Sequence, residues 1–396
     1  MTKDHTSLFS LKDLDLKNKK VFVRLDLNVP LEKEGEEQWI VSDDNRIREA
    51  IPTLEYLIEQ GAKIIIGSHL GRPKGEKNSA FSLEPVATHL AQLLEKEVLL
   101  ADDCIGEGIE LMVTQLAPRQ ILMLENLRFY KEETENETRF VHKLARLGEV
   151  YVTDAFGTCH RKHASTYGLP EAMAHKGYGF LIEKELQYLQ PLLHQPKKPF
   201  YAILGGSKVS DKIKMIESLM VHLDGLLIGG AMAHAFWKAK DKDLPEKAKQ
   251  PTSEDIEAAH QVIFQAKKKG IPLIIPRDTI DGFDIGEKTI REFCDELKNA
   301  KTVFWNGPLG WFEKEEYAKG TFEVAKFLSE HDGIKIVGGG DTVSAIRSAG
   351  LSQKFTHLST GGGAVLEFLE SGKLPGIEIL RNYSTVARRD ILTYEE

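Results

Sequence analysis

Short apolar runs alternate with amphipathic stretches along almost the whole chain. The apolar runs are KVFVRLDL, AKIIIGS, QILML, EVYVTD, PFYAIL, GLLIGG, IPLIIP, KTVFW, IKIVGG and FTHLS. Between them, segments such as IREAIPTLEYLIEQ and LEPVATHLAQLLEK repeat apolar residues at helical spacing. Short buried strands that alternate with helices are typical of parallel sheets covered on both faces. The pattern therefore predicts an α/β fold with doubly wound, Rossmann-like parallel sheets.

The length of the chain indicates more than one domain, because 396 residues exceed what a single hydrophobic core usually holds. A break falls where a predicted helix, residues 181–193, is followed by the proline-containing segment 196–199. We therefore expect two domains that face a central cleft. They are residues 1–183 and residues 184–380, the second beginning with an interdomain helix. Residues 381–396 are expected to form a C-terminal tail, to which no role is assigned.

Composition and charge narrow the class of protein. Hydrophobic residues make up 41% of the chain and charged residues 28%, as in ordinary soluble globular proteins. The net charge of −8 argues against nucleic acid as the main partner. Neither a signal peptide nor a membrane span is evident. The three cysteines form no C-x-x-C pair, which fits a reducing compartment. We expect a cytoplasmic monomer that binds small molecules and neither nucleic acid nor membranes.

Polar side chains follow four predicted strands of the first half, in RLDLNVP, GSHLGRP, LENLRFY and TDAFGTCHRKH. Ligands of open parallel sheets bind beyond the carboxyl ends of the strands, and these ends lie at one edge. An arginine at the start of a predicted helix, in DDNRIREA, could reach the same place. The candidate residues are Asp26, Asn28, Arg46, His69, Arg72, Arg128 and Arg161.

The chemistry of this set favours an anionic ligand. The planar fork of arginine binds carboxylate and phosphate oxygens in pairs, so several arginines indicate a ligand with more than one anionic group. Asp26 and Asn28 could orient a hydroxyl group of the same ligand. Taken singly, each residue has a simpler role as a turn arginine, a turn cap or a strand-end histidine. Their recurrence at four strand ends favours a binding site.

Adjacent glycines occur only beyond residue 200, in Gly205-Gly206, Gly229-Gly230, Gly338–Gly340 and Gly361–Gly363. Each cluster follows a predicted strand and precedes a helix-like stretch. Backbone N–H groups can approach a phosphate there. A single pair is more often a tight turn, but repeated strand–glycine–helix units favour a nucleotide site. None of them completes G-x-x-x-x-G-K-[ST] or G-x-G-x-x-G, which disfavours a regular P-loop or dinucleotide site.

Residues beside the glycines add chemistry to this half. Lys208 and Lys212 are four residues apart and are predicted on one face of an opening helix, where they would meet phosphates or merely form a solvated face. Asp341 could hold Mg²⁺ or cap a helix, and Thr342 could equally cap it. Glu313, in WNGPLGWFE, could accept hydrogen bonds from ribose hydroxyls or be a solvated acid at a helix start.

Together these motifs resemble the phosphoglycerate kinase family. RLDLNVP, DDNRIREA, SHLGRP, LENLRFY, DAFGTCHRKHAST, GGSKVSDK, WNGPLG, GGGDT and STGGGA occur in family order and cover the chain to about residue 380. The resemblance implies a phosphotransferase of glycolysis and gluconeogenesis with a carboxyl group as acceptor. It would transfer a phosphoryl group reversibly from 1,3-bisphosphoglycerate to ADP, giving 3-phosphoglycerate and ATP. The transfer would be in-line, Mg²⁺-dependent and preceded by domain closure.

The resemblance also implies roles for individual residues. The seven candidates of the first half would bind phosphoglycerate, and residues 184–380 would bind ADP or ATP. The catalytic residues would be Arg46, Lys208 and Lys212. The nucleotide contacts would be Gly206, Lys212, Asn306, Glu313, Gly339, Gly340, Asp341 and Thr342, with Asp341 at the metal and Gly361, Gly362 and Gly363 as a phosphate loop.

Two other functions predict different sequence features. A nicotinamide-dependent dehydrogenase would need G-x-G-x-x-G followed by an acid about twenty residues later, and no cluster supplies that pattern. A non-catalytic anion- or nucleotide-binding module would be indicated by the loss of Arg46, Lys212 or Asp341, and all three are present. A Cys159–histidine nucleophile is disfavoured, because the neighbouring arginine has a simpler role.

Overall fold

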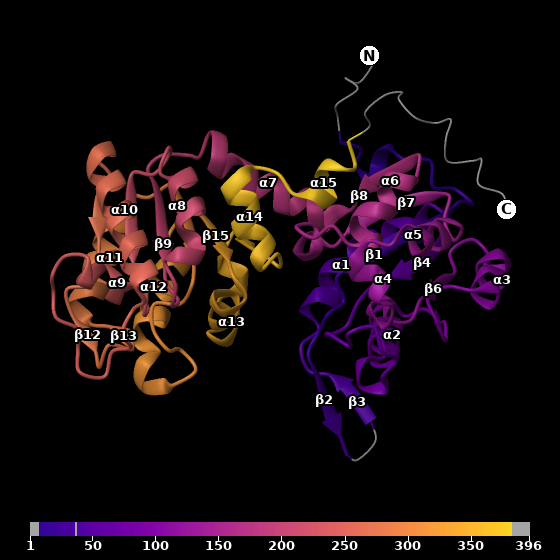
Figure 1. Ribbon diagram of the computed structural model, residues 1–396, viewed down its shortest axis with the longest axis horizontal. Helices are drawn as coiled ribbons and strands as arrows, with labels where there is room; N and C mark the ends of the chain where they lie inside the picture. The colour runs from indigo at the N-terminus through magenta and orange to yellow at the C-terminus, as the bar shows by residue number, and fades with distance from the viewer. Residues whose placement is uncertain (1–7, 36–37, 382–396) are drawn as a thin grey trace. The chain divides into compact units, whose positions relative to one another are not determined.

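The apolar runs predicted as strands lie in two six-stranded parallel sheets, each within its own α/β unit (Figure 1). The computed structural model describes residues 8–35 and 38–381. Within this range, unit 1 comprises the chain up to Lys184 and again from Lys373, and unit 2 comprises Glu185–Gly372. The helix α7 (Phe180–His194) carries the chain from unit 1 into unit 2. The predicted fold class is therefore confirmed.

The sheet of unit 1 has the strand order β5-β6-β4-β1-β7-β8, and every pairing is parallel. Central strand β1 is buried along almost its whole length because helices cover both faces. Alternate residues of β1 enter different cores: Val23 packs in the cluster that includes α1 and α2, and Phe22 packs in the cluster that includes α3 and α5. The strands are β1 (Lys20–Leu25), β4 (Lys63–Gly67), β5 (Val98–Leu100), β6 (Ile121–Met123), β7 (Val150–Asp154) and β8 (His175–Tyr178).

The helices of unit 1 follow the predicted amphipathic stretches where these were long. The helices are α1 (Asn45–Glu59), α2 (Glu84–Leu94), α3 (Glu107–Gln115), α4 (Lys131–Glu135), α5 (Thr138–Ala145) and α6 (Leu169–Ala172). A π-helical turn, η5 (Ala164–Gly168), precedes α6. Two antiparallel strands, β2 (Leu31–Glu34) and β3 (Gln38–Val41), form a separate hairpin that the sequence pattern did not predict.

Unit 2 repeats the design with the strand order β11-β10-β9-β14-β15-β16, again parallel throughout. The strands are β9 (Phe200–Leu204), β10 (Gly225–Ile228), β11 (Leu273–Ile274), β14 (Thr302–Asn306), β15 (Ile334–Gly338) and β16 (His357–Leu358). The helices are α8 (Ile213–Leu219), α9 (Ala233–Lys238), α10 (Ser253–Lys269), α11 (Glu287–Leu297), α12 (Lys319–Ser329), α13 (Gly340–Ser348) and α14 (Gly363–Ser371). A short antiparallel pair, β12 (Thr279–Ile280) and β13 (Asp284–Ile285), lies outside the main sheet.

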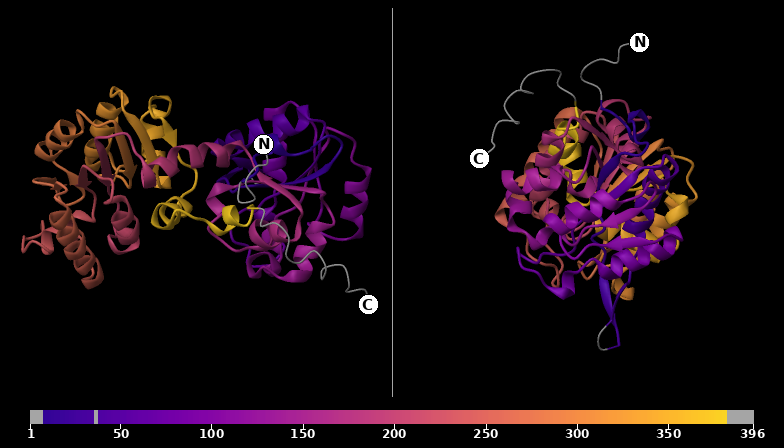
Figure 2. Two further views of the ribbon diagram at one scale, coloured as in Figure 1. Left: turned by 90° about the horizontal axis from the view of Figure 1, so that it is seen from above. Right: turned by 90° about the vertical axis from the view of Figure 1, so that its right-hand side faces the viewer.

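The end of the described chain belongs to unit 1, which corrects the expectation that residues 184–380 form one domain. The backbone N–H of Gly376 in α15 (Pro375–Glu378) donates to the carbonyl of Cys159 at 2.8 Å. Leu380 is fully buried in the core that also contains Leu169. Figure 1 shows α15 beside elements of unit 1, and the left view of Figure 2 shows the yellow end of the described chain beside the same unit. Of the expected tail, residues 382–396 lie outside the described residues.

Candidate functional site

The carboxyl ends of the strands in unit 1 bring the predicted polar residues together, because all six strands run in the same direction. The loop after β4 is tied to the loop after β1 by a hydrogen bond from the Gly71 N–H to Asn28 Oδ1 at 2.8 Å. It is tied to the loop after β6 by a hydrogen bond from Arg128 Nη1 to the Gly71 carbonyl at 2.7 Å. Three separate strand ends thus form one structured edge.

Arg46 and Asp26 form an ion pair at this edge. Arg46 is the second residue of α1, and its Nη1 lies 2.9 Å and 3.0 Å from the two carboxylate oxygens of Asp26. Asp26 also accepts from the Asn28 N–H at 3.3 Å. The Arg46 side chain is 35% exposed, whereas that of Asp26 is 10% exposed. Since both contacts use Nη1, the rest of the guanidinium remains to meet an anion.

A cavity of about 380 Å³ opens beside this edge and is strongly cationic. Three of the predicted arginines line it, together with two lysines and a histidine that sequence reasoning did not select. Glu135 is the only acid among its lining residues. An excess of arginine and lysine in a small concave space suits a phosphate group. The lining residues are Arg72, Lys74, Gly75, Arg128, Tyr130, Lys131, Thr134, Glu135, Arg161 and His163.

Burial and neighbouring charge set the protonation of this region. Burial, with the charges of Arg24 and Arg161, lowers the pKa of Arg128 to about 10, so the guanidinium stays charged at neutral pH. Burial, with the surrounding arginines, lowers the pKa of His163 to about 4. The same causes hold the pKa of His69 well below its ordinary value. The arginines therefore carry the positive charge, and both imidazoles are neutral.

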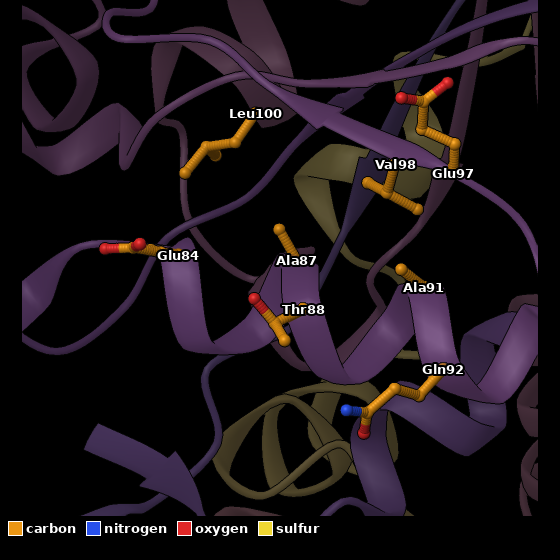
Figure 3. Close-up of a pocket in the computed structure, with 8 residues that line it drawn as sticks. All are labelled: Glu84, Ala87, Thr88, Ala91, Gln92, Glu97, Val98 and Leu100. Carbon is orange, nitrogen blue, oxygen red and sulfur yellow. The ribbon is translucent and has the colours of Figure 1, made fainter. Parts of the chain in front are cut away.

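Another cavity of unit 1 has a different character. It is lined by residues of α2 and by residues in and just before β5 (Figure 3). Its eight lining residues include two acids, Glu84 and Glu97, and no cation. This chemistry does not suit an anion, so the cationic cavity is the candidate phosphate site of unit 1.

The glycine clusters of unit 2 all lie at the carboxyl edge of its sheet, but the structure separates them into two kinds. A Cβ at Gly205 would lie 2.1 Å from the Pro308 carbonyl oxygen, and one at Gly229 would lie 2.4 Å from the Leu309 side chain. These glycines let two loops of the protein approach each other. By contrast, a Cβ at Gly340 or Gly363 would meet nothing within 4 Å, and one at Gly206 would come no closer than 3.7 Å to another atom. The backbone at these three glycines is open to a ligand.

Lys212 is held at the edge of the β9 loop by carbonyl groups. Its Nζ donates to the carbonyls of Gly205 at 2.9 Å and Asn306 at 3.1 Å. Burial lowers the pKa of Lys212 to about 8, although Asp341 and Asp211 act in the opposite direction. Near pH 8, part of the Lys212 population is therefore neutral. The Nζ contacts backbone carbonyls and no carboxylate among the described residues, so it suits the binding of a phosphate.

Lys208 and Lys212 do not share the face of one helix, so that prediction is wrong. Residues 205–209 form an irregular loop, Ser210–Lys212 is a single 3₁₀ turn, and α8 begins only at Ile213. Lys208 is exposed, and its Nζ lies 4.0 Å from the Asp211 carboxylate. The helix begins later than the spacing of the lysines suggested, because the chain first passes through this loop, in which Gly206 has a φ of 83°.

The first turn of α13 holds the candidate metal residue. Gly339 precedes the helix with a φ of 90°, a conformation that favours glycine. Thr342 is fully buried and its Oγ1 accepts from the Gly307 N–H at 2.7 Å, whereas Asp341 is exposed. No cluster of three or more His, Cys, Asp or Glu arranged for a metal occurs in the described part of the chain. One exposed carboxylate fits Mg²⁺ that is also held by phosphate oxygens.

The remaining predicted contacts of unit 2 differ in their burial. Asn306 is buried at the end of β14, and its carbonyl accepts from the Gly205 N–H at 3.0 Å as well as from Lys212. Glu313 is exposed in the turn after β14, so its carboxylate is free to reach a ligand. Gly362 precedes α14 with a φ of 52° and Gly363 begins this helix.

A buried acid that sequence reasoning missed anchors the loop before Gly361–Gly363. Glu185 in α7 is fully buried and accepts hydrogen bonds from His357 Nε2 at 2.8 Å and Ser359 Oγ at 2.7 Å. It also accepts from the Thr360 N–H at 2.9 Å. All of these groups belong to unit 2. Glu185 therefore fixes the end of β16 and the start of the predicted phosphate loop.

Several polar residues of unit 1 were also missed. Asn126 is fully buried, and its amide bonds to the backbone of Leu70, Phe81 and Arg128, which positions the arginine. Arg24 is only 1% exposed, although it is charged, because it lies within the buried strand β1. The signal for Arg24 was present, since a charge inside the apolar run KVFVRLDL needs a partner.

One α/β unit has a cationic cavity, and the second has open glycine loops and a buried lysine, Lys212. These features are typical of a kinase that acts on a small anionic molecule. The comparisons with known proteins give the family. The sequence model described as phosphoglycerate kinase matches residues 11–281 and 278–373. The chain therefore belongs to the phosphoglycerate kinase family.

Individual relatives agree with this assignment over nearly the whole chain. A phosphoglycerate kinase of Anaeromyxobacter sp. (strain Fw109-5) is 45% identical, covering 94% of this chain and 99% of the relative. A cytosolic phosphoglycerate kinase of Triticum aestivum is 46% identical, covering 94% and 97%. The solved structure of phosphoglycerate kinase from Coxiella burnetii superposes with a TM-score of 0.82 at 36% identity, covering 94% of this chain and 98% of that one. The family predicted from the motifs is confirmed.

No helix among the described residues is long and apolar enough to cross a membrane.

Proposed function

We propose that this chain transfers a phosphoryl group reversibly between 1,3-bisphosphoglycerate and ADP, forming 3-phosphoglycerate and ATP. Membership of the phosphoglycerate kinase family supports this reaction. The observation that carries it is the cationic cavity of unit 1, which joins Arg72, Arg128 and Arg161 at the ends of three different strands. A cavity of this charge and size suits a small phosphorylated acid.

The three-carbon acid has two anionic ends, and unit 1 offers two neighbouring places for them. The phosphate of 3-phosphoglycerate would lie in the cationic cavity, where arginine forks can hold its oxygens. The carboxylate end would lie beside Arg46 and the neutral His69. Asp26 and Asn28 would then orient the hydroxyl group, since each has a side-chain oxygen at the same edge.

The nucleotide would bind at the carboxyl edge of unit 2. Its phosphates would meet Lys212, the open backbone at Gly340 and the Thr342 hydroxyl, which still has its hydrogen to donate. Lys208 would approach from the exposed side of the same loop, and Glu313 would accept from the ribose. The further contacts are the backbone groups of Gly206, Asn306, Gly339, Gly361, Gly362 and Gly363.

Mg²⁺ fits this site as a partner of the nucleotide. When bound, Mg²⁺ would neutralise charge on the nucleotide phosphates. Asp341 would hold it with a single carboxylate, because the exposed side chain stands in the first turn of α13 beside the proposed phosphates. Lys212, whose pKa of about 8 leaves it partly neutral alone, gains its full charge when phosphate oxygens approach.

The reaction needs charge stabilisation more than proton transfer. A carboxylate and a nucleotide β-phosphate are both nucleophiles without a general base. The proposed catalytic residues, Arg46, Lys208 and Lys212, would surround the three equatorial oxygens of the phosphoryl group in flight. These residues belong to different units, so the units must close for in-line transfer and exclude water that would hydrolyse the acyl phosphate. The protein should scatter as a more compact particle with both ligands bound than with either one.

The test is a coupled assay of the purified full chain with 3-phosphoglycerate, ATP and Mg²⁺. Turnover is expected, and Arg161→Gln should raise the KM for 3-phosphoglycerate by about tenfold or more, since a charged hydrogen bond is lost. Lys162→Gln is the matched control, because the neighbouring Lys162 is exposed and does not line the cavity. Absence of turnover by the folded protein would overturn the proposed reaction. Equal effects of both variants would remove Arg161 from the site.

A further inference from the structure

A row of buried side chains runs from the interior of unit 1 to His69. Its members are Glu133 in α4, Ser165 in the π-helical turn, Arg24 in β1 and His69 after β4. None of the four is more than 3% exposed. Only His69 belongs to the predicted substrate site. The other three lie behind it, and we call the row the Glu133–His69 chain.

The hydrogen bonds of this row have a fixed direction. Ser165 Oγ lies 2.6 Å from Glu133 Oε1, and the Ser165 N–H donates to Oε2 at 2.9 Å. Arg24 Nε donates to Ser165 Oγ at 2.8 Å. Arginine has no acceptor atom, so the single hydroxyl hydrogen of Ser165 must go to Glu133. The Tyr151 hydroxyl holds the Ser165 carbonyl at 2.9 Å, which fixes the turn in place.

The same rule determines the hydrogen on His69. Arg24 Nη2 lies 3.2 Å from His69 Nδ1, and Arg24 can only donate. Nδ1 must therefore accept, which leaves the hydrogen of the neutral imidazole on Nε2. The nearest carboxylate oxygen, Asp26 Oδ1, is 4.0 Å from Nδ1, too far to take a hydrogen bond from it. Arg24 is the hydrogen-bonding partner that sets the tautomer.

Arg24 can occupy this place because a counter-charge lies behind it. A buried guanidinium is costly unless it is paired, and Arg46, Arg128 and Arg161 already make the region positive. The Glu133 carboxylate offsets this charge through Ser165. Its two hydrogen bonds favour the ionised carboxylate, against a burial that raises its pKa. Without that carboxylate, the buried charge of Arg24 would lose its compensation, and we expect its side chain to move away from His69.

We propose that Glu133, acting through Ser165 and Arg24, is a positioning residue that fixes His69 as the neutral Nε2–H tautomer. The consequence for the enzyme rests on the proposed function: Nε2 then presents a hydrogen-bond donor to an oxygen of the bound three-carbon acid. The other tautomer would present a lone pair to that oxygen and repel it. Glu133 thereby affects substrate affinity without touching the substrate.

The first measurement is a long-range ¹H–¹⁵N correlation spectrum of the full chain labelled at histidine, recorded without substrate. The His69 signals, assigned with His69→Gln, should show Nδ1 without a hydrogen and Nε2 with one from about pH 6 to about pH 8, where an ordinary histidine titrates. Glu133→Gln should add the second tautomer or titration of the ring, whereas Glu132→Gln, the neighbouring half-exposed acid, should not. A wild-type His69 with hydrogen on Nδ1, or one that is charged, would overturn the proposal.

The second measurement separates positioning from mere stability. Glu133→Gln should raise the KM for 3-phosphoglycerate by about tenfold with a smaller change in kcat, by analogy with the outer partners that orient metal-binding histidines. If Glu133→Gln does not fold, Ser165→Ala breaks the same row and decides the matter. An unchanged tautomer and an unchanged KM in the folded variant would remove Glu133 from this role. The spectrum needs no activity, so a failure of the proposed reaction would leave its outcome readable.

Discussion

Lys212 should take up a proton when the nucleotide binds. Burial against the carbonyls of Gly205 and Asn306 lowers its pKa to about 8 in the free protein. The charges of bound phosphates would return the pKa toward the ordinary value for lysine. At pH 8 about half of the free molecules have a neutral Lys212, and at pH 7 about a tenth. Binding should therefore take up about 0.5 proton at pH 8 and about 0.1 proton at pH 7.

Isothermal titration calorimetry measures this uptake directly. Mg²⁺-ADP is titrated at each pH in two buffers of different ionisation enthalpy, and the difference in heat gives the number of protons. Lys212→Met should abolish the uptake at pH 8. Lys208→Met is the control, because Lys208 is exposed, whereas the Nζ of Lys212 is held by two backbone carbonyls. Equal uptake by the wild type and Lys212→Met would refute the assignment of Lys212 as the poised phosphate ligand.

The remaining predictions concern one site residue and two buried groups. Arg46→Ala should lower kcat by about 10²-fold or more while the affinity for ADP changes little, and near-normal turnover would remove Arg46 from the transition state. Glu185→Gln should lower the free energy of unfolding of unit 2 by about 3 kcal/mol, since it disrupts a buried network. Urea unfolding against Glu183→Gln, a half-exposed acid of the same helix, measures this change, and equal midpoints would contradict it. Burial raises the pKa of Cys159 to about 12, so peptide mass spectrometry should find it unalkylated by iodoacetamide until the protein unfolds.

The sequence predicted the fold well where the apolar pattern was strong. All ten expected strands lie in the two parallel sheets, and the long amphipathic stretches became α1, α2 and α7. The strands that were missed carry a weaker signal. β5 has three residues, and β8 reads HKGY, which has a lysine and a glycine where a buried strand usually has β-branched residues. The β2–β3 hairpin was missed because each strand has only four residues and β2, which reads LEKE, is polar.

The site could be predicted only as far as local rules reach. Residues at the ends of parallel strands meet at one edge whatever the loops do, so Asp26, His69 and Arg128 were accessible from the sequence. The partnership of Arg24 with Ser165 joins residues 141 positions apart, and no local pattern indicates it. The spacing of Lys208 and Lys212 led to a wrong prediction, because residues four apart share a face only within a helix. The helix α8 begins after both lysines, at Ile213.

The return of α15 to unit 1 bears on how the protein is made. Unit 2 is one continuous stretch of chain, Glu185–Gly372, so the ribosome synthesises it without interruption by residues of unit 1. Unit 1 lacks Leu380 and the backbone partner of Cys159 until the last part of the chain has emerged. The half that is synthesised first can therefore complete its core only after all of unit 2 has been synthesised. A chain that stopped directly after Gly372 would contain all of unit 2 and would leave unit 1 with a gap in its core.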